Sequence, residues 1–323
     1  MNKVRHGPEG RALEAQLAER APELDAWGLS QTAWGLGWLG WGSAQLGAAL
    51  EAAAQARLGD FTPQGTANLV WGLARQGHRP GAGFVDAVAA HAGGQMAAMK
   101  PMEFVSLLQG LAAFGDGDPT SAAAALRFHA GWGEDFVRAN FRFFKNMELV
   151  KYLDALRGLG HLPDEEILAE TAARILRTAP EVPAVCRYAW LCAKLGYEPE
   201  ARDLRRAEAF VAGRLALGEC KPVDVANFVW GCQQIGFPLA AETLEAATAH
   251  GVAALAARPA GADDRDVASL CWALAGYGEA ERLQRVVAAV ADLGDAGVAR
   301  FRPWSVCMLL GAVSASVGPR PPS

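Results

Sequence analysis

The chain has 323 residues, of which 51% are hydrophobic, and its formal net charge at pH 7 is −5. The negative total argues against indiscriminate binding to nucleic acid. No apolar run reaches the roughly 18 residues that a membrane helix needs, so we do not expect an integral membrane protein. Residues 1–25 mix acidic and basic side chains, which is typical of neither a signal peptide nor an organelle transit peptide. We expect them to form an N-terminal helical cap.

From residue 26 onward one short pattern recurs, most clearly as Ala-Asn-Leu-Val-Trp-Gly at 67–72 and Ala-Asn-Phe-Val-Trp-Gly at 226–231. With the tryptophan as anchor, successive copies are 37, 38, 45, 36, 40, 42 and 38 residues apart. The eight anchor positions are Trp34, Trp71, Gln109, Asp154, Trp190, Trp230, Trp272 and Leu310. Periods of this length are typical of stacked helical repeats.

Each copy predicts two helices. In the second copy Thr62 is suited to cap a helix, Pro63 to its first turn, and Gly77 to end it in a left-handed conformation. A glycine follows six residues after the anchor in seven copies, and the clearest second helix runs over about 163–177. The sequence therefore predicts an all-α fold, a right-handed-type α-solenoid of about eight helix–turn–helix repeats of roughly 38–40 residues.

The solenoid is expected to form one continuous domain over 26–316, with a longer insertion at 119–146 and a disordered tail at 317–323. The insertion interleaves Arg138, Arg142 and Lys145 with aromatic residues, a pattern that can bind single strands by charge and stacking. Alternatively, it is a long second helix whose aromatic side chains fill a bent junction.

The first helix of each copy is apolar around most of its circumference. Only the positions three before, one after and four after the anchor form a narrow polar or small-residue window. The predicted RNA-binding or partner-binding residues in this window are Gln31, Asn68, Arg75, Ser106, Lys151, Arg187, Lys194, Asn227, Gln234 and Ser269. The alternative is an ordinary solvated edge, in which the glycines at position +1 only let neighbouring helices pack closely.

The tryptophan column is expected to be core, so that truncating Trp190 or Trp230 to alanine would cost about 3–5 kcal/mol. Asp154 replaces the tryptophan in the fourth copy, with Lys151 and Arg157 placed to shield its charge. Residues 146–162 are therefore expected to open before residues 222–236 in hydrogen exchange.

No nucleotide-binding, hydrolase or metalloprotease motif is present, which argues against an enzyme. The six cysteines form no Cys-x-x-Cys pair and are interpreted as small core residues. The six histidines show no metal-ligand spacing, so neither a metal nor another cofactor is expected.

The stretch Ala-Asn-Leu-Val-Trp-Gly-Leu-Ala-Arg-Gln-Gly-His-Arg-Pro at 67–80 resembles the octotricopeptide repeat, and 226–231 and 269–275 match the same first-helix signature. The resemblance covers roughly 26–316. It implies an organellar factor, in a chloroplast or mitochondrion, that recognises single-stranded RNA and acts in RNA metabolism, ribosome assembly or translation. The alternative, favoured by the acidic total and the large stock of apolar residues, is a structural subunit that packs against proteins in a large organellar complex, a ribosome or a membrane complex.

Overall fold

The structure, a computed structural model, describes residues 7–81, 83–178, 180–257 and 263–317. Every regular element in these ranges is a helix and none is a strand, which confirms the predicted all-α class. None of the described helices is both long and apolar enough to span a membrane. The predicted tail lies outside the described residues from position 318 onward.

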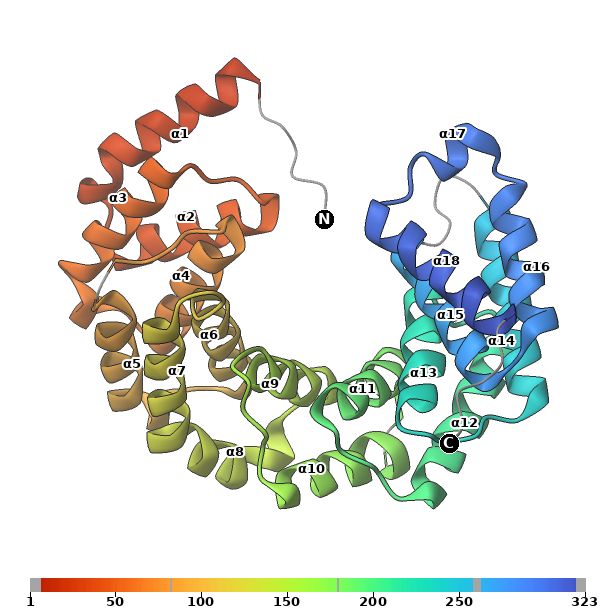
Figure 1. Cartoon of the computed structure of the whole chain (residues 1–323). Helices are drawn as coiled ribbons and strands as arrows, with labels where there is room; N and C mark the ends of the chain where they lie inside the picture. Colours follow the sequence, from red (N-terminus) through yellow and green to blue (C-terminus); the bar gives the residue numbers. More distant parts are fainter. Residues whose placement is uncertain (1–6, 82, 179, 258–262, 318–323) are drawn as a thin grey trace. The chain divides into compact units, whose positions relative to one another are not determined.

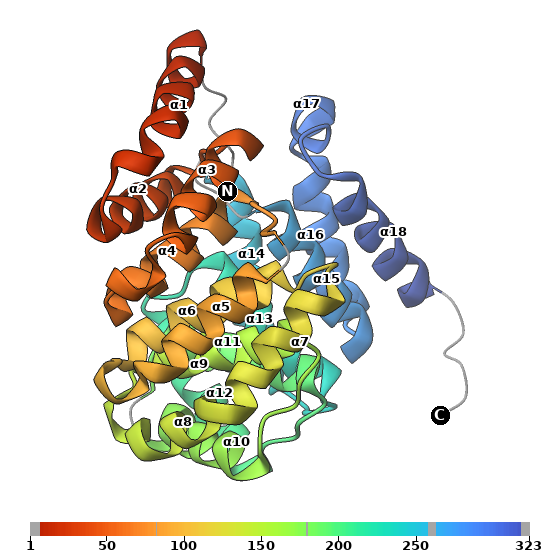
Figure 2. The same ribbon diagram turned by 90° about the vertical axis from the view of Figure 1, so that its left-hand side faces the viewer.

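The chain forms two compact units, Met1–Pro163 and Asp164–Ser323. Unit 1 contains α1 (Pro8–Arg20), α2 (Ala26–Leu39), α3 (Ala44–Gln55), α4 (Pro63–Gln76), α5 (Phe84–Gly94), α6 (Pro101–Phe114), α7 (Pro119–Phe128), α8 (Glu134–Asn140) and α9 (Asn146–Gly158). Helices α2, α4, α6 and α9 carry the first four anchors and pack on one another in sequence, while α1, α3, α5 and α7 pack side by side in a second layer (Figures 1 and 2).

Unit 2 contains α10 (Glu165–Ala172), α11 (Val182–Leu195), α12 (Ala201–Ala216), α13 (Pro222–Gln234), α14 (Ala241–Ala256), α15 (Asp264–Tyr277), α16 (Ala280–Ala291), α17 (Gly294–Val298) and α18 (Pro303–Val317). Here α11, α13, α15 and α18 carry the last four anchors and pack in sequence, and α12, α14 and α16 form the other layer. We call the helices with an anchor the anchor helices, and the others that follow them the companion helices.

Local signals place the helix ends as the sequence predicts. The Thr62 hydroxyl accepts a hydrogen bond from the Gly65 amide at 3.1 Å and caps α4. Six of the seven predicted glycines have a positive φ, as at Gly77 with 78°. The exception is Gly115, which stays right-handed, while Gly117 takes the positive φ two residues later. The sequence predicts a single α-helix over 163–177, but the structure has two segments there. The α-helix α10 ends at Ala172, and a π-helical segment continues to Thr178.

Glycine after the anchor lets consecutive anchor helices approach to backbone contact. A Cβ atom on Gly72 would lie 2.2 Å from the carbonyl oxygen of Ala33 on the preceding anchor helix, and one on Gly231 would lie 2.6 Å from that of Ala189. A Cβ atom on Gly35 would have no described atom within 4 Å, because α2 has no preceding anchor helix. The glycine column therefore serves helix packing, the alternative that the sequence left open, and most of it is buried.

The tryptophan anchors do not form the core, so that prediction is wrong. Trp34 is 42% exposed, Trp272 is 39% exposed, and Trp71, Trp190 and Trp230 are half-buried. At 100° per residue, the anchor lies about 40° from position +4 and about 60° from position −3, whereas position +1 lies at the helix contact. The solvated side of each anchor helix is thus centred between the anchor and positions −3 and +4.

This orientation also removes the reason to expect a weak fourth anchor helix. The Asp154 carboxylate is half-buried on the solvated side and accepts a hydrogen bond from Arg157 Nε at 2.8 Å. Of the two cations predicted to shield it, only Arg157 does so, because Lys151 forms no ion pair with any described residue. An aspartate at a solvated position has little desolvation cost. The expected early opening of residues 146–162 therefore loses its physical basis.

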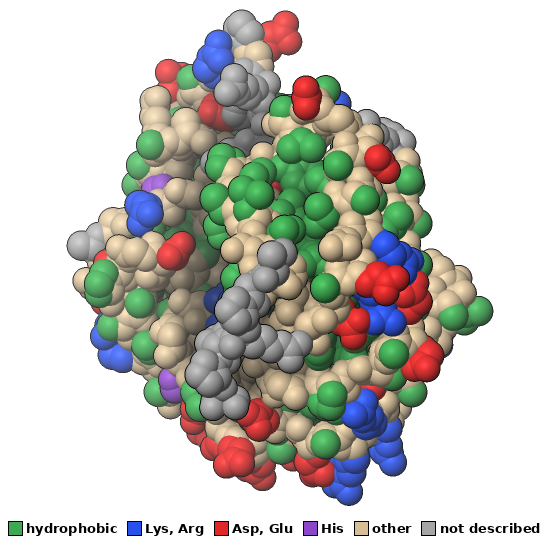
Figure 3. Space-filling model, turned by 45° about the vertical axis from the view of Figure 1, so that its right-hand side comes forward, with side chains coloured by type: hydrophobic (Ala, Val, Ile, Leu, Met, Phe, Trp, Pro, Cys, Tyr) green, Lys and Arg blue, Asp and Glu red, His purple; other side chains and the backbone are tan. Residues whose placement is uncertain are grey.

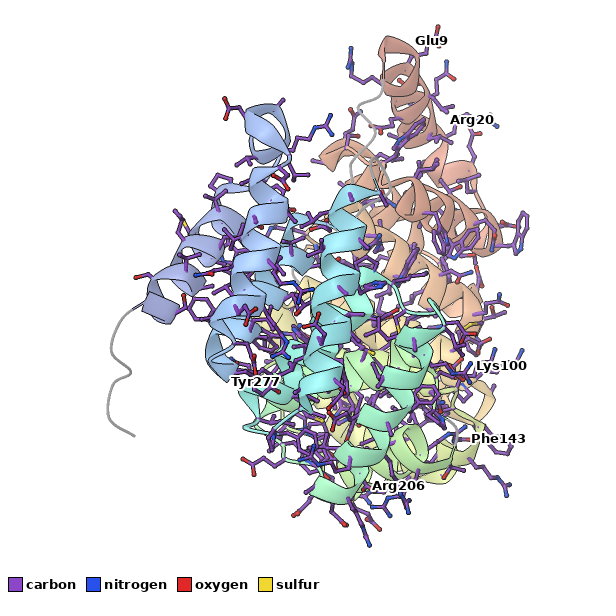
Figure 4. The ribbon with its side chains drawn as sticks, turned by 90° about the vertical axis from the view of Figure 1, so that its right-hand side faces the viewer. Glu9, Arg20, Lys100, Phe143, Arg206 and Tyr277 are labelled. Carbon is purple, nitrogen blue, oxygen red and sulfur yellow. The ribbon has the colours of Figure 1, made fainter. Side chains whose placement is uncertain are left out.

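The structure of the insertion mostly agrees with the second alternative, in which its aromatic side chains fill a bent junction between helices. A π-helical segment, η4 (His129–Gly133), joins α7 to α8. Buried rings of Phe128, Phe136 and Phe144 pack around Phe104, with ring centroids 4.9–6.5 Å apart. Phe143 instead projects from the surface (Figure 4).

The cysteine interpretation holds for five of six residues, which are buried, whereas Cys307 is exposed. Burial raises the pKa of the Cys271 thiol to about 12, so that it stays protonated and inert at neutral pH.

Companion helices carry acids, but arginines of the same layer neutralise many of them. Glu245 of α14 accepts from Arg285 of α16 at 2.6 Å, and the Asp203 carboxylate of α12, only 1% exposed, is paired with Arg177 at 2.5 Å. Figure 3 shows Lys and Arg side chains lying beside Asp and Glu on the surface. This layer is therefore mixed in charge rather than simply acidic.

Candidate functional site: the anchor face

The solvated side of the anchor helices is the candidate functional site. We call it the anchor face and define it by the anchors and the positions 7 and 3 residues before and 4 residues after them, which share a sector of about 60°. Among the described residues, those at positions −3 and +4 are all half-buried or exposed. The face is thus continuously open to solvent along each unit.

In unit 1 the anchor face is hollowed into a groove of about 460 Å³. Its lining comes from α2, α4, α6 and α9 and consists of Gln31, Trp34, Trp38, Gln64, Ala67, Asn68, Trp71, Met102, Glu103, Ser106, Gln109 and Lys151. A smaller hollow of about 160 Å³ shares Gln31, Gln64 and Asn68 with it and extends toward Trp27. The packing of consecutive anchor helices therefore joins side chains from four repeats into one site.

Three indole rings form a connected series in this groove. The ring centroids of Trp34 and Trp38 are 6.1 Å apart, and those of Trp38 and Trp71 are 5.6 Å apart. The Arg75 guanidinium carbon lies 5.6 Å from the Trp71 ring centroid. Trp38 is 58% exposed, so that part of its ring surface is available to a ligand. Such rings offer stacking surfaces that are flanked by positive charge.

Unit 2 repeats the combination of indole and cation. The centroids of Trp190 and Trp230 are 6.3 Å apart. The Arg187 guanidinium carbon lies 3.9 Å from the Trp190 centroid, and the Lys194 ammonium lies 4.6 Å from the Trp230 centroid. Contacts of this length are typical of cation–π interactions. Arg187 and Lys194 come from positions −3 and +4 of one helix, so the repeat pattern itself creates the arrangement.

Polar groups in the groove of unit 1 have unused hydrogen-bonding capacity. Within the described ranges, the side-chain amides of Gln31 and Asn68 form no hydrogen bond with protein groups. The one acid of the groove, Glu103, is engaged, because its Oε2 accepts from the Lys100 amide at 2.9 Å. Neither Lys151 nor Lys194 forms an ion pair with any described residue. A ligand in the groove would meet these two amides and the Lys151 ammonium without first breaking a hydrogen bond or ion pair to a described residue.

The structure thus brings together four predicted site residues, Gln31, Asn68, Ser106 and Lys151, in one groove. Arg75 adjoins them through Trp71. Asn227 and Ser269 are half-buried on α13 and α15.

The remaining predicted residues are placed less distinctively. Gln234 is exposed and donates from Nε2 to Gln233 Oε1 at 2.6 Å, so part of its capacity is used locally. Arg138, Arg142 and Lys145 are exposed in the insertion, and Arg142 lies 4.6 Å from the Phe143 centroid. They do not line the groove.

The sequence analysis did not predict that the indoles line the site, nor that the residues seven positions before each anchor do so. Trp34, Trp71 and Gln109 lie at the anchor itself, while Gln64 and Met102 lie two helical turns earlier. A residue at −7 lies about 20° from the anchor on a helical wheel, in the middle of the open sector. Extending the wheel by one more turn would have found these residues, the first of which is the exposed Trp27.

No protein-family model matches the chain, and no curated protein matches it either. The fold and the site define the class: an all-helical protein whose anchor helices present indoles, amides and cations on one face.

Proposed function

We propose that the protein binds single-stranded RNA along its anchor face. The observation that carries the proposal is the groove of unit 1, which is lined by three indoles, by Lys151 and by the amides of Gln31 and Asn68, neither of which has a hydrogen-bond partner among the described residues. Unpaired bases are recognised by stacking on aromatic side chains and by hydrogen bonds to their edges. Stacking contributes about 1–3 kcal/mol per base, and nearby cations attract the phosphates.

In this proposal the anchor helices and their companions are about eight repeats of one right-handed-type α-solenoid, each roughly 38–40 residues long. The chain would be a divergent member of the octotricopeptide repeat family. That assignment implies a role in a chloroplast or mitochondrion, in RNA metabolism, ribosome assembly or translation. At one nucleotide per repeat, the footprint is at most about eight nucleotides.

The side chains divide into two roles. The amides of Gln31, Asn68 and Asn227 supply a donor and an acceptor each, which suits base edges and hence sequence preference. Lys151 and Lys194 hold phosphates. Because the companion layer is mixed in charge and the net charge is −5, binding away from the anchor face is weak and the face dominates selectivity.

Charge reversal on the anchor face tests the proposal. We would measure fluorescence anisotropy of a labelled pool of short single-stranded RNA with the wild type and with Lys151→Glu/Lys194→Glu. We expect at least a tenfold loss of affinity and a shallower salt dependence, since each lost phosphate contact removes about 0.7 from the slope of log K against log salt.

A matched control reverses two exposed cations that lie off the anchor face, Arg206→Glu/Arg300→Glu. Neither has an ion pair among the described residues, and Figure 4 shows Arg206 at the periphery of its helix layer. The control has the same net charge as the test variant, so equal losses in both would mean non-specific attraction and would reject the assignment. Wild-type protein that does not bind the pool at moderate salt would reject it as well.

A second candidate is a structural subunit that packs against proteins in a large organellar complex, a ribosome or a membrane complex. The observation that favours it lies on α18, where Trp304 is exposed and Leu310 is 65% exposed. Exposed tryptophans are frequent binding hot spots at protein interfaces. Trp304→Ala/Leu310→Ala would then abolish co-purification of defined proteins. If that variant keeps every protein partner, this candidate is excluded.

A further inference from the structure

Two histidines and a glutamate meet in unit 1, away from the groove. His129 is the first residue of η4, Glu134 is the first residue of α8, and His161 lies in the turn after α9. The Glu134 Oε1 atom lies 4.0 Å from His129 Nδ1 and 3.9 Å from His161 Nε2. One ligand atom from each of the three residues lies within 4.8 Å of the other two.

The π-helical segment creates this cluster. His129 and Glu134 are five residues apart, which places them about 140° apart on an α-helix. In η4 the Glu134 amide donates to the His129 carbonyl, the i→i+5 bond of a π-helix, so the two residues lie one above the other. His161 is added by the turn at Gly160, whose φ is 68°, and its own amide donates to the Leu156 carbonyl at 2.9 Å. Segments of this kind occur frequently at functional sites.

Each imidazole has one ring nitrogen near Glu134 that forms no hydrogen bond with a described residue. His129 Nε2 lies 2.8 Å from the Tyr152 hydroxyl. If this nitrogen carries the proton, Nδ1 presents its lone pair toward Glu134. His161 Nε2 is buried and has no hydrogen-bond partner among the described residues. A buried, unsatisfied nitrogen costs stability unless a ligand occupies it.

We propose that His129 Nδ1, the Glu134 carboxylate and His161 Nε2 form a binding site for a divalent transition-metal ion, with Zn²⁺ as the best match. Two imidazoles and a carboxylate are a recurrent zinc ligand set, and imidazole disfavours Mg²⁺ and Ca²⁺. Bonds of 2.0–2.2 Å in a tetrahedral site place the ligand atoms roughly 3.4 Å apart. The two Glu134 distances exceed this value by about half an ångström, and the ligand atoms of the two histidines lie within 4.8 Å of each other. Binding of the ion would therefore draw both imidazoles and the Glu134 carboxylate inward.

The surroundings fit such a site. The Tyr152 hydroxyl gives His129 the outer partner that metal-bound histidines normally have, and so fixes its ring. Glu134 is 37% exposed and His161 is 36% exposed, so water can reach the fourth coordination position. The ion would link the start of α8 to the turn after α9, holding the insertion against its anchor helix.

Zinc titration of the full chain tests the site. After treatment with a chelator and dialysis, equilibrium dialysis against ZnCl₂ should give one tightly bound ion per chain, and Co²⁺ should give the visible absorption of a tetrahedral nitrogen and oxygen site. Cys307→Ser serves as the background, because an exposed thiol is a competing ligand. In this background Glu134→Gln and His161→Asn should each weaken binding by at least tenfold.

His250→Asn is the matched control, since His250 is a half-buried histidine of unit 2 and should leave zinc affinity unchanged. Far-UV circular dichroism of each apo variant shows whether it keeps its helices, and Glu134→Gln changes only a half-exposed side chain. Absence of saturable zinc binding by the wild type overturns the proposal. So does binding that persists in both ligand variants, or that disappears with Cys307 alone.

Discussion

Gly72 offers the most specific prediction about the fold. A Cβ atom there would meet backbone atoms of the preceding anchor helix, 2.2 Å from Ala33 O and 2.7 Å from Trp34 N. Backbone atoms cannot rotate away, so α2 and α4 must separate by about 1 Å. Overpacking of this kind lowers the free energy of unfolding by about 1–3 kcal/mol or more. The higher helix propensity of alanine raises it by about 1 kcal/mol, which offsets part of this loss. Because the approach of 2.2 Å is short, we expect a net loss in the upper part of the resulting range, so that Gly72→Ala lowers the free energy of unfolding by about 1–2 kcal/mol.

Gly35→Ala is the control, because Gly35 occupies the same repeat position on α2 but a Cβ atom there would have no atom of the described residues within 4 Å. Only the helix propensity changes, so the free energy of unfolding should rise by about 0.5–1 kcal/mol. Urea denaturation followed by circular dichroism gives both values from the midpoints, provided that the slopes agree. A Gly72→Ala variant as stable as Gly35→Ala would refute the close helix crossing.

Three further predictions concern unit 2. Because the Trp190 ring is half-buried, Trp190→Ala should lower the free energy of unfolding by about half of the 3–5 kcal/mol that truncation of a fully buried ring would cost. Thermal unfolding should show a correspondingly small decrease in the melting temperature. Tyr188→Phe removes the buried hydrogen bond from the tyrosine hydroxyl to Leu168 O at 3.0 Å and should cost about 1 kcal/mol in urea denaturation; an unchanged midpoint would mean that another donor replaces it. Burial, together with the charge of nearby Asp263, raises the pKa of the Asp266 carboxyl to about 6. Between about pH 4 and pH 6 the folded state therefore binds more protons than the unfolded state. The stability of unit 2 falls as the pH rises through this window. Asp266→Asn should therefore stabilise unit 2 at pH 7, by roughly 1–2 kcal/mol after allowance for the exposed part of the side chain, and give no gain at pH 4.

Helix positions were predictable because their signals are local. Thr62, Pro63 and Gly77 fix the ends of α4 through capping, a preset φ and a left-handed turn, none of which depends on distant contacts. The regular spacing between the anchor and the glycine likewise identified the anchor helices, which pack on one another within each unit. Gly115 shows the limit, because the positive φ moved to Gly117, where the chain turns toward α7.

The orientation of the anchor helices was harder to predict, because hydrophobicity alone suggested that a tryptophan column must be buried. Closely crossing backbones at Gly72 and Gly231 determine which side faces the neighbour, and the bulky indoles then have room only on the open side. The sequence does contain this information, as glycine directly follows the tryptophan in the clearest copies. It becomes readable only when the glycine is understood as a contact rather than as space for a ligand.

The cluster of His129, Glu134 and His161 could not be found from spacing at all. Its geometry depends on a π-helical segment that sequence periodicity does not mark, and on a third residue 27 positions further along the chain. A search for ligand spacing assumes regular α-helices, in which residues five apart diverge. The arrangement is therefore visible only in the folded chain.

Crosslinking tests RNA recognition by the anchor face most directly. Ultraviolet irradiation of the native protein with its bound RNA, followed by mass spectrometry of the crosslinked peptides, locates the contacts residue by residue. We predict that nucleotide adducts fall on α2, α4, α6 and α9, at Trp34, Trp38 and Trp71 above all. Adducts confined to the companion helices, or recovery of protein crosslinks without any RNA, would contradict it.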